Sequence, residues 1–215
     1  MGLARLIALQ APAGALGMVP ARGGPMRDLS PLTDEALMFR WRDGDLDAFR
    51  ALYGRHRARL HRYILRMTGA LAEAEEVFQE VWMGVVRSRE SWSPTAAFRT
   101  WLFAIANRRL ADRSRKRARR FHEVFARPVD DESIVLPPSS DPDPAEATHA
   151  AELGRALLAA LGALPAEQRQ AFLLQAEGGL SLEEIAEATG VGRETVKSRL
   201  RYANQRLRRE LEAWR

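Results

Sequence analysis

Apolar residues recur every three or four positions along the first half of the chain, which is the spacing of an amphipathic α-helix. The first helix is predicted from Thr33 to about Arg42, because Thr33 can cap a helix and the two acids after it complement the unpaired N–H groups of the first turn. A longer apolar stripe covers residues 46–67, and Gly69 is the residue type that commonly ends a helix.

Two more helices are predicted in this half, over residues 72–89 and 96–120, each with one apolar face. The segment SWSP at residues 91–94 separates them, since its proline interrupts the helical pattern. No stretch alternates apolar and polar residues as a half-buried strand would. The pattern therefore predicts an all-α domain.

The pattern changes over residues 127–148, where five prolines stand among acidic residues, a composition typical of a linker. Such a segment is either solvated or lies in a basic channel, and composition leaves both alternatives open. Leucines at helical spacing then resume and continue to the C-terminus. We predict an all-α fold of two small helical domains joined by a flexible, acidic, proline-rich linker. The expected parts are a disordered extension (1–29), a first domain (30–120), the linker (121–148) and a second domain (149–215).

The second domain contains the pattern of a helix-turn-helix. Ser181 and Glu184 have the spacing of a capping box, and Gly190 can adopt the left-handed conformation of a tight turn. A second helix follows Gly192, and in this motif the second helix enters the major groove of DNA. The alternative is a generic helical hairpin. The residues expected to pack the two helices together are Ile185, Ala186, Val191, Val196 and Leu200.

Composition adds a charge preference to this picture. The 215 residues carry a net charge of +5, and the sequence pI is about 10.3, which favours an acidic partner such as nucleic acid. The absence of cysteine excludes disulfides and thiolate metal sites and is compatible with the cytoplasm. No run approaches the ~20 apolar residues of a membrane span. The apolar stretch in residues 3–17 is too short to favour a signal peptide, so we expect no membrane insertion.

The predicted second helix of the motif is rich in arginine. Arginine can bind guanine with two hydrogen bonds, whereas Glu194 either accepts from cytosine or caps its own helix. Arg206, Arg208 and Arg209 lie further along and are expected to meet phosphates or solvent. The candidate DNA-reading residues are Arg193, Glu194, Thr195, Lys197, Ser198, Arg199 and Arg201.

A second basic region ends the predicted helix 96–120, where RSRKRARR at residues 113–120 holds no acid. Aromatic residues stand just upstream, and aromatics beside basic residues can stack on unpaired bases. For Phe98 and Trp101 the alternative is core packing, which their helical spacing favours. The aromatic residues of this group are Trp92, Phe98, Trp101 and Phe103.

Three segments in order, AEEVFQEVWMGVV (74–86), FRTWLFAIANRRLADRSRKR (98–117) and LSLEEIAEATGVGRETVKSRL (180–200), resemble the signatures of a bacterial sigma factor of the extracytoplasmic-function (ECF) group. The resemblance covers roughly residues 34–211. It implies a subunit that joins RNA polymerase core, recognises the −35 promoter element with its C-terminal domain, and opens and captures the −10 element with its N-terminal one. It also implies control by an anti-sigma factor.

The resemblance carries over to individual positions. It implies that residues of the 74–86 helix dock to the clamp of the largest polymerase subunit: Glu75, Glu76, Phe78, Gln79, Glu80 and Trp82. It implies that a second set forms the −10 pocket and its basic surroundings: Trp92, Phe98, Thr100, Trp101, Asn107, Arg108, Arg109, Arg113 and Arg115. By the same resemblance the acidic linker threads toward the RNA exit channel.

Two departures from the family pattern stand out. Glu76 takes a position where aspartate is common, a mild change. The family favours Arg-Ala-Arg shortly after SRL, whereas this chain has Tyr-Ala-Asn at 202–204, so we expect Arg201 to supply the missing contact.

Two other classes of function were weighed. An enzyme is not expected, because Glu146 and His149 form a lone metal-motif spacing without a second copy and no nucleophile stands in a catalytic context. We therefore predict no cofactor, no metal and no catalytic residue. A helix-turn-helix regulator that acts on duplex DNA without joining polymerase is the alternative, but such a protein has no use for aromatics aimed at unpaired bases.

Overall fold

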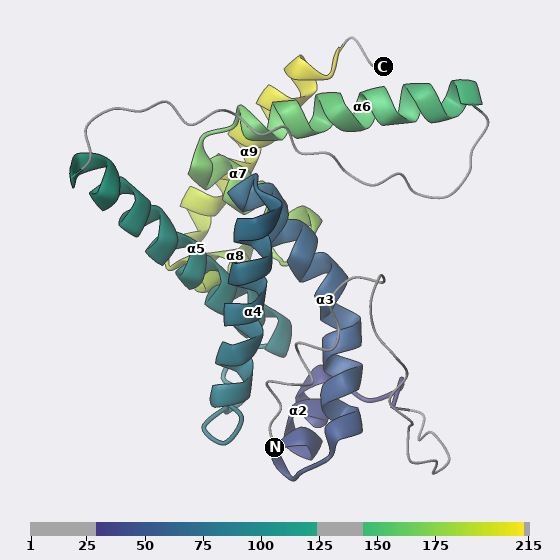
Figure 1. Cartoon of the computed structure of the whole chain (residues 1–215), viewed down its shortest axis with the longest axis vertical. Helices are drawn as coiled ribbons and strands as arrows, with labels where there is room; N and C mark the ends of the chain where they lie inside the picture. The colour runs from purple at the N-terminus through teal and green to yellow at the C-terminus, as the bar shows by residue number, and fades with distance from the viewer. Residues whose placement is uncertain (1–28, 124–143, 213–215) are drawn as a thin grey trace.

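The computed structural model describes residues 29–123 and 144–212. The expected extension lies outside these residues except for Leu29, which is buried, and most of the expected linker lies outside them as well. Every regular element in the described part is a helix, which confirms the all-α prediction (Figure 1). The helices are α2 (Asp34–Arg42), α3 (Leu46–Thr68), α4 (Leu71–Arg87), α5 (Phe98–Glu123), α6 (Pro144–Gly162), α7 (Ala166–Ala176), α8 (Leu182–Thr189) and α9 (Arg193–Glu210). None of these helices has both the length and the hydropathy to cross a bilayer.

The first helical unit, α2–α5, is held by an aromatic core. Trp82 is fully buried, with its ring centroid 4.8 Å from that of Tyr53 and 5.9 Å from that of Phe49. Trp41 lies 4.6 Å from Phe49 on the other side. Burial of rings of this size removes a large apolar area from water, and that area provides most of the driving force for packing these helices.

Polar contacts at helix ends fix how α2 sits on this unit. The Thr33 hydroxyl accepts from the Ala36 N–H at 3.2 Å, as the capping prediction requires. The Glu35 carboxylate reaches across and accepts from the backbone N–H of Phe98, the first residue of α5, at 2.9 Å. Arg55 of α3 donates to the carbonyl oxygens of Leu29 and Ser30, so the chain entering α2 is anchored to α3.

The second unit, α6–α9, contains the predicted helix-turn-helix. The Ser181 side chain accepts from the Glu184 N–H and the Glu184 carboxylate accepts from the Ser181 N–H, which confirms the capping box at the start of α8. Gly190 ends α8 with φ of 70°, in the left-handed region that glycine adopts without strain. Ile185 and Val196 are fully buried between α8 and α9. The helical geometry predicted for this motif is therefore present.

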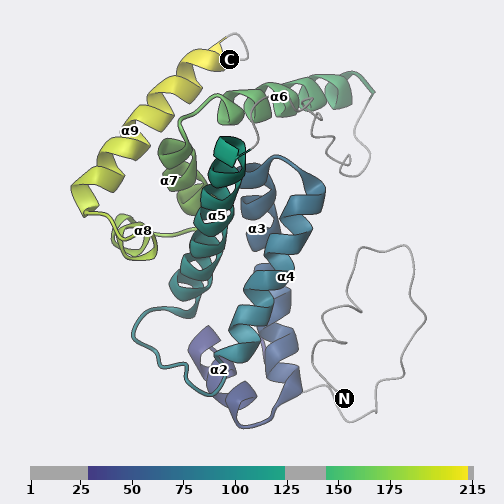
Figure 2. The same cartoon turned by 60° about the vertical axis from the view of Figure 1, so that its left-hand side comes forward.

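The two units pack against one another, and this packing was not predicted. Helix α7 contacts α3 and helix α8 contacts α5, so α7–α9 lie beside the first unit, and α6 runs across its upper end (Figure 2). The buried apolar side chains of both units belong to one continuous cluster. The described residues thus form a closed arrangement in which the first helix of the helix-turn-helix covers part of α5.

Candidate nucleic-acid interface

The outward face of α9 is open to solvent along its length. Arg193, Glu194, Thr195, Lys197 and Arg201 are exposed, whereas Ser198 and Arg199 are half-buried. The inward face buries Val196, Leu200, Ala203 and Leu207 against the rest of the unit. All seven predicted DNA-reading residues therefore lie on or beside a basic helical face that is free of contact with the first unit.

Short ion pairs cross the start of α9. Arg193 Nε lies 2.5 Å from the Glu183 carboxylate of α8, and this hydrogen bond raises the pKa of Arg193 and lowers that of Glu183. Glu194 pairs with Arg193 at 3.3 Å and Lys197 at 3.6 Å, so its carboxylate faces its basic neighbours rather than a backbone N–H. The capping alternative for Glu194 is therefore not what the structure shows. Exposed pairs of this kind contribute little and exchange readily for phosphate.

Arg201 lies against the residue that departs from the family pattern. Its guanidinium carbon stands 4.9 Å from the centroid of the Tyr202 ring, and Nη2 donates to the Tyr202 hydroxyl at 3.2 Å. Arg206 and Arg208 are exposed on the following turns, where a phosphate backbone could reach them. The basic face of α9 thus extends well beyond its N-terminal turn.

The aromatic residues before and at the start of α5 lie largely inside the first unit. Trp92 is 6% exposed, with its ring 5.4 Å from Phe39 and 6.3 Å from Trp101 in edge-to-face geometry. Phe98 is fully buried and Trp101 is half-buried. The core-packing alternative is therefore what the structure shows for Phe98, and Trp92 has a packing role in this arrangement as well.

Thr100 and Asn107 of α5 are covered by the second unit. The Thr100 hydroxyl donates to the Glu184 carboxylate at 3.0 Å. The Asn107 amide oxygen accepts from the Tyr63 hydroxyl and from Gln170 Nε2 at 3.2 Å, and its Nδ2 lies 3.5 Å from the Ala188 carbonyl oxygen. Asn107 is only 5% exposed, so the amide that was predicted to contact a base is engaged within the chain.

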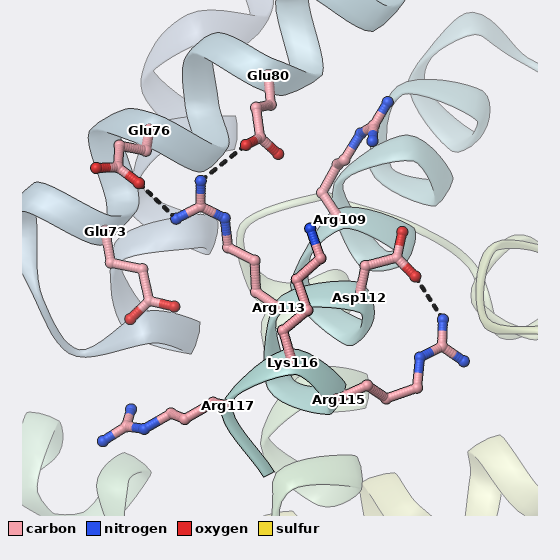
Figure 3. Close-up of a pocket in the computed structure, with 9 residues that line it drawn as sticks. All are labelled: Glu73, Glu76, Glu80, Arg109, Asp112, Arg113, Arg115, Lys116 and Arg117. Atoms are coloured by element: carbon pink, nitrogen blue, oxygen red, sulfur yellow. Dashed lines mark hydrogen bonds and ion pairs between the residues drawn. The ribbon is translucent and has the colours of Figure 1, made fainter. Parts of the chain in front are cut away.

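The basic end of α5 and the acidic face of α4 form a pocket of about 670 Å³. Arg113 points from α5 to α4 and bridges Glu76 at 2.7 Å and Glu80 at 2.8 Å (Figure 3). Hydrogen bonds from Arg113 to these carboxylates raise its pKa. Arg108 and Arg115 are exposed, and Arg109 is half-buried in the same region. A predicted DNA contact and two predicted polymerase contacts thus meet one another.

The remaining residues predicted to dock to polymerase divide into two groups. Gln79 is exposed, and the half-buried Glu75 carboxylate lies 2.9 Å from His61 Nε2. Phe78 and Trp82 are instead core residues, 8% and 0% exposed, since their positions along α4 bring both rings to the face that meets Tyr53. Neither ring is exposed to a partner. The prediction that these two side chains contact the polymerase directly is therefore corrected: they pack α4 onto the core.

A set of ion pairs between the units was missed by the sequence reasoning. Glu177, at the end of α7, pairs with Arg62 and Arg66 of α3, and Glu184 pairs with Arg99 of α5. The partners lie far apart along the chain, and each residue alone is typical of a solvated helical face. No local pattern identifies such pairs.

Comparison with known proteins places both units in one family. Residues 52–120 match Sigma-70 region 2, and residues 154–207 match Sigma-70, region 4. The ECF RNA polymerase sigma factor SigL of Mycobacterium tuberculosis is 39% identical over 165 residues, covering 76% of this chain and 88% of SigL. SigE of Mycolicibacterium smegmatis, also an ECF RNA polymerase sigma factor, is 35% identical over 175 residues, covering 81% of this chain and 63% of SigE.

A solved structure supports the same assignment. The sigma factor RpoE of Bartonella quintana, crystallised with the anti-sigma factor NepR, matches with a TM-score of 0.63 and 25% identity, covering 78% of this chain and 98% of RpoE. Both sigma regions occur in order along this chain, region 2 in the α2–α5 unit and region 4 in the α6–α9 unit. This chain belongs to the ECF sigma factors, initiation subunits of bacterial RNA polymerase.

Proposed function

We propose that this chain joins RNA polymerase core and directs initiation at promoters whose −35 element α9 reads in the duplex. The observation that carries this proposal is the basic outward face of α9, which stays free of the first unit while α8 supports it from behind. Arg193, Lys197 and Arg201 supply donors for base edges and phosphates on that face. The chain acts as a binding subunit in the cytoplasm, and the polymerase performs the chemistry.

The −10 element is assigned to the loop before α5 and to α5 itself. Asn107 and Thr100 supply amide and hydroxyl groups for a base that has left the stack, and Arg108 and Arg115 supply cations near its backbone. Trp92 and Trp101 support the shape of this loop by packing on one another. A base can reach Asn107 only after α7 and α8 have moved away from α5, because Asn107 is buried in the closed chain and bonded to Gln170 of α7 and Ala188 of α8.

Docking to core polymerase is assigned to the exposed polar face of α4. Glu76 and Gln79 project from the side of α4 opposite its buried valines, so a basic partner surface can reach them without unfolding the unit. Glu76 would exchange its pair with Arg113 for a pair with the polymerase. Arg113 would then be available to a DNA phosphate.

Control by an anti-sigma factor is part of the proposal. The structurally similar RpoE is held by the anti-sigma factor NepR in its crystal structure. We propose that a protein of this class holds the present chain until a signal releases it. Co-purification of the chain with the product of a neighbouring gene, and loss of initiation when that product is added to purified protein, would test this part.

A pull-down with purified core polymerase tests the central part of the proposal. The full chain should retain core polymerase. The double variant Glu76→Ala/Gln79→Ala should retain at least about tenfold less, because it lacks the carboxylate and the amide that the proposal places at the interface. Glu187→Ala, which removes an exposed carboxylate from α8, is the control and should bind as the parent does. A chain that binds promoter duplex but never core polymerase would instead be an independent helix-turn-helix regulator.

A further inference from the structure

A buried carboxylate of the second unit sits between two arginines of the first. Glu177 is 7% exposed; its Oε2 accepts from Arg62 Nε at 2.8 Å, and its Oε1 accepts from Arg66 Nη1. The two arginines are separated by one turn of α3, so both point to the same side of that helix. Together they form a two-pronged cationic site on α3 that the Glu177 carboxylate occupies, although the Arg62 side chain stays 48% exposed.

A second carboxylate covers an adjacent cation in the same way. Glu184 of α8 accepts from Arg99 Nη2 at 3.4 Å and from the Thr100 hydroxyl at 3.0 Å. Gly179, between α7 and α8, has φ of 64°, and a Cβ there would be in van der Waals contact with two guanidinium groups, 3.5 Å from that of Arg99 and 3.7 Å from that of Arg59. The covered surface therefore includes Thr100 of α5. Asn107, further along α5, is covered by α8.

The chemistry of this covered surface is that of a phosphate-binding surface. Guanidinium groups bind phosphate and carboxylate oxygens with the same donors, so a carboxylate that holds an arginine occupies the place a phosphate would take. Arg99 precedes Thr100 on α5, and Tyr63, which follows Arg62 on α3, donates to the Asn107 amide. Thr100 and Asn107 are the two polar residues assigned to an unpaired base. A nucleotide bound there would bring its base to the amide and its phosphates to the arginines.

We propose that Arg62, Arg66 and Arg99 bind the backbone phosphates of the single strand captured at the −10 element, and that Glu177 and Glu184 occupy these positions in the closed chain. The free protein is thereby prevented from binding single-stranded DNA until the two units separate. The proposal rests on the proposed function for the identity of the strand. The arginines themselves lie outside the residues that the resemblance assigned.

The two sides of one ion pair provide the test. Glu177→Gln removes the charge that holds both arginines, and Arg62→Ala removes one of the two pairs, so small-angle scattering of the full chain should show an expansion for each variant. Binding of a fluorescein-labelled single-stranded oligonucleotide of mixed sequence should differ between them. Glu177→Gln should bind at least about fivefold more tightly than the parent, because the competent population rises. Arg62→Ala should show no gain, because it also loses a phosphate contact.

Matched variants control for charge and folding. Glu187→Gln removes the same charge from an exposed position on α8 and should change neither the scattering nor the affinity. Glu184→Gln keeps a residue that serves in a capping box while weakening the hold on Arg99, so it should raise strand affinity independently of Glu177. Circular dichroism of each variant should match that of the parent.

Three outcomes would overturn the proposal. Equal gains in strand affinity for Arg62→Ala and Glu177→Gln would mean that the ion pair only holds the two units together and that Arg62 binds no phosphate. Expansion of Glu177→Gln without tighter strand binding would mean that the exposed surface does not bind DNA. No change in scattering or in strand affinity would mean that Glu177 does not hold the two units together. Core-polymerase binding of the same proteins reports on the proposed function separately, since its loss leaves the strand-binding comparison intact.

Discussion

At the scale of single residues, the Asn107 amide illustrates how a group assigned to DNA also holds the closed chain. Its oxygen is the acceptor for the fully buried Tyr63 hydroxyl and for Gln170. Burial raises the pKa of Tyr63 far above its ordinary value, so the phenol stays a neutral donor that needs an acceptor. Removing the amide would leave a buried hydroxyl without a partner.

We therefore predict unequal costs for the two ends of this hydrogen bond. Asn107→Ala should lower the free energy of unfolding by about 1–3 kcal/mol, because it leaves buried polar groups unpaired. Tyr63→Phe should cost less, about 0.5–1.5 kcal/mol, since Asn107 still accepts from Gln170. Urea denaturation of the full chain measures both values, and a larger cost for Tyr63→Phe would contradict this account.

Asp34 provides a second prediction at this scale, concerning pH. Burial raises its pKa, but hydrogen bonds and charge from His56 and Arg55 outweigh burial and hold the pKa below its ordinary value. A lowered folded pKa adds stability above the unfolded pKa of about 4, and this stability is lost as pH falls through the folded value. Asp34→Asn should thus destabilise the chain at neutral pH, and the gap to the parent should narrow below about pH 4. Acid unfolding of both proteins, followed by circular dichroism, measures this difference in stability. A difference that stays constant as pH falls would contradict the mechanism.

At the scale of elements, helix ends with local chemical signals were predictable. Thr33, Gly69, Ser181 and Gly190 each cap or end a helix as expected, because capping depends on neighbours within a few residues. The start of α6 was missed: it begins at Pro144, inside the predicted linker. Proline interrupts the interior of a helix, so several prolines in a segment indicate a linker. Proline is also favoured at the first position of a helix, and composition alone does not distinguish the two cases.

Helix α9 carries a prediction about DNA specificity. Lys197 lies on the N-terminal half of its exposed face and Arg208 on the last turn. Lys197→Ala should cost about 1–3 kcal/mol on the preferred −35 duplex and little on random duplex, because a base contact discriminates between sequences. Arg208→Ala should weaken binding to both duplexes equally and reduce the salt dependence, because it removes a phosphate contact.

Competition binding of the full chain to the two duplexes, over a range of salt concentrations, distinguishes these roles. Glu187→Ala is the control for a change on the other helix of the motif. A change of sequence preference in the Arg208 variant would place the reading face elsewhere on α9.

At the scale of the whole molecule, the closed arrangement of the two units could not be read from the sequence. Glu177 meets Arg62 and Arg66 across separations of 115 and 111 residues, and no periodicity links positions so distant. The same holds for Glu184, whose capping role was predicted but whose contacts with Arg99 and Thr100 were not. Motifs in order were enough to identify the family, because each is local, whereas the masking of Asn107 depends on tertiary contacts alone.

Transcription with purified core polymerase over a promoter library from the source genome tests the central claim most directly. Core enzyme with the full chain should start transcripts at a defined set of promoters that share −35 and −10 elements, and core enzyme alone should start none of them. The Glu76→Ala/Gln79→Ala variant should lose these transcripts in parallel with its loss of core binding. Absence of any chain-dependent start site, with core binding and duplex binding both intact, would contradict the assignment of this protein as an initiation subunit.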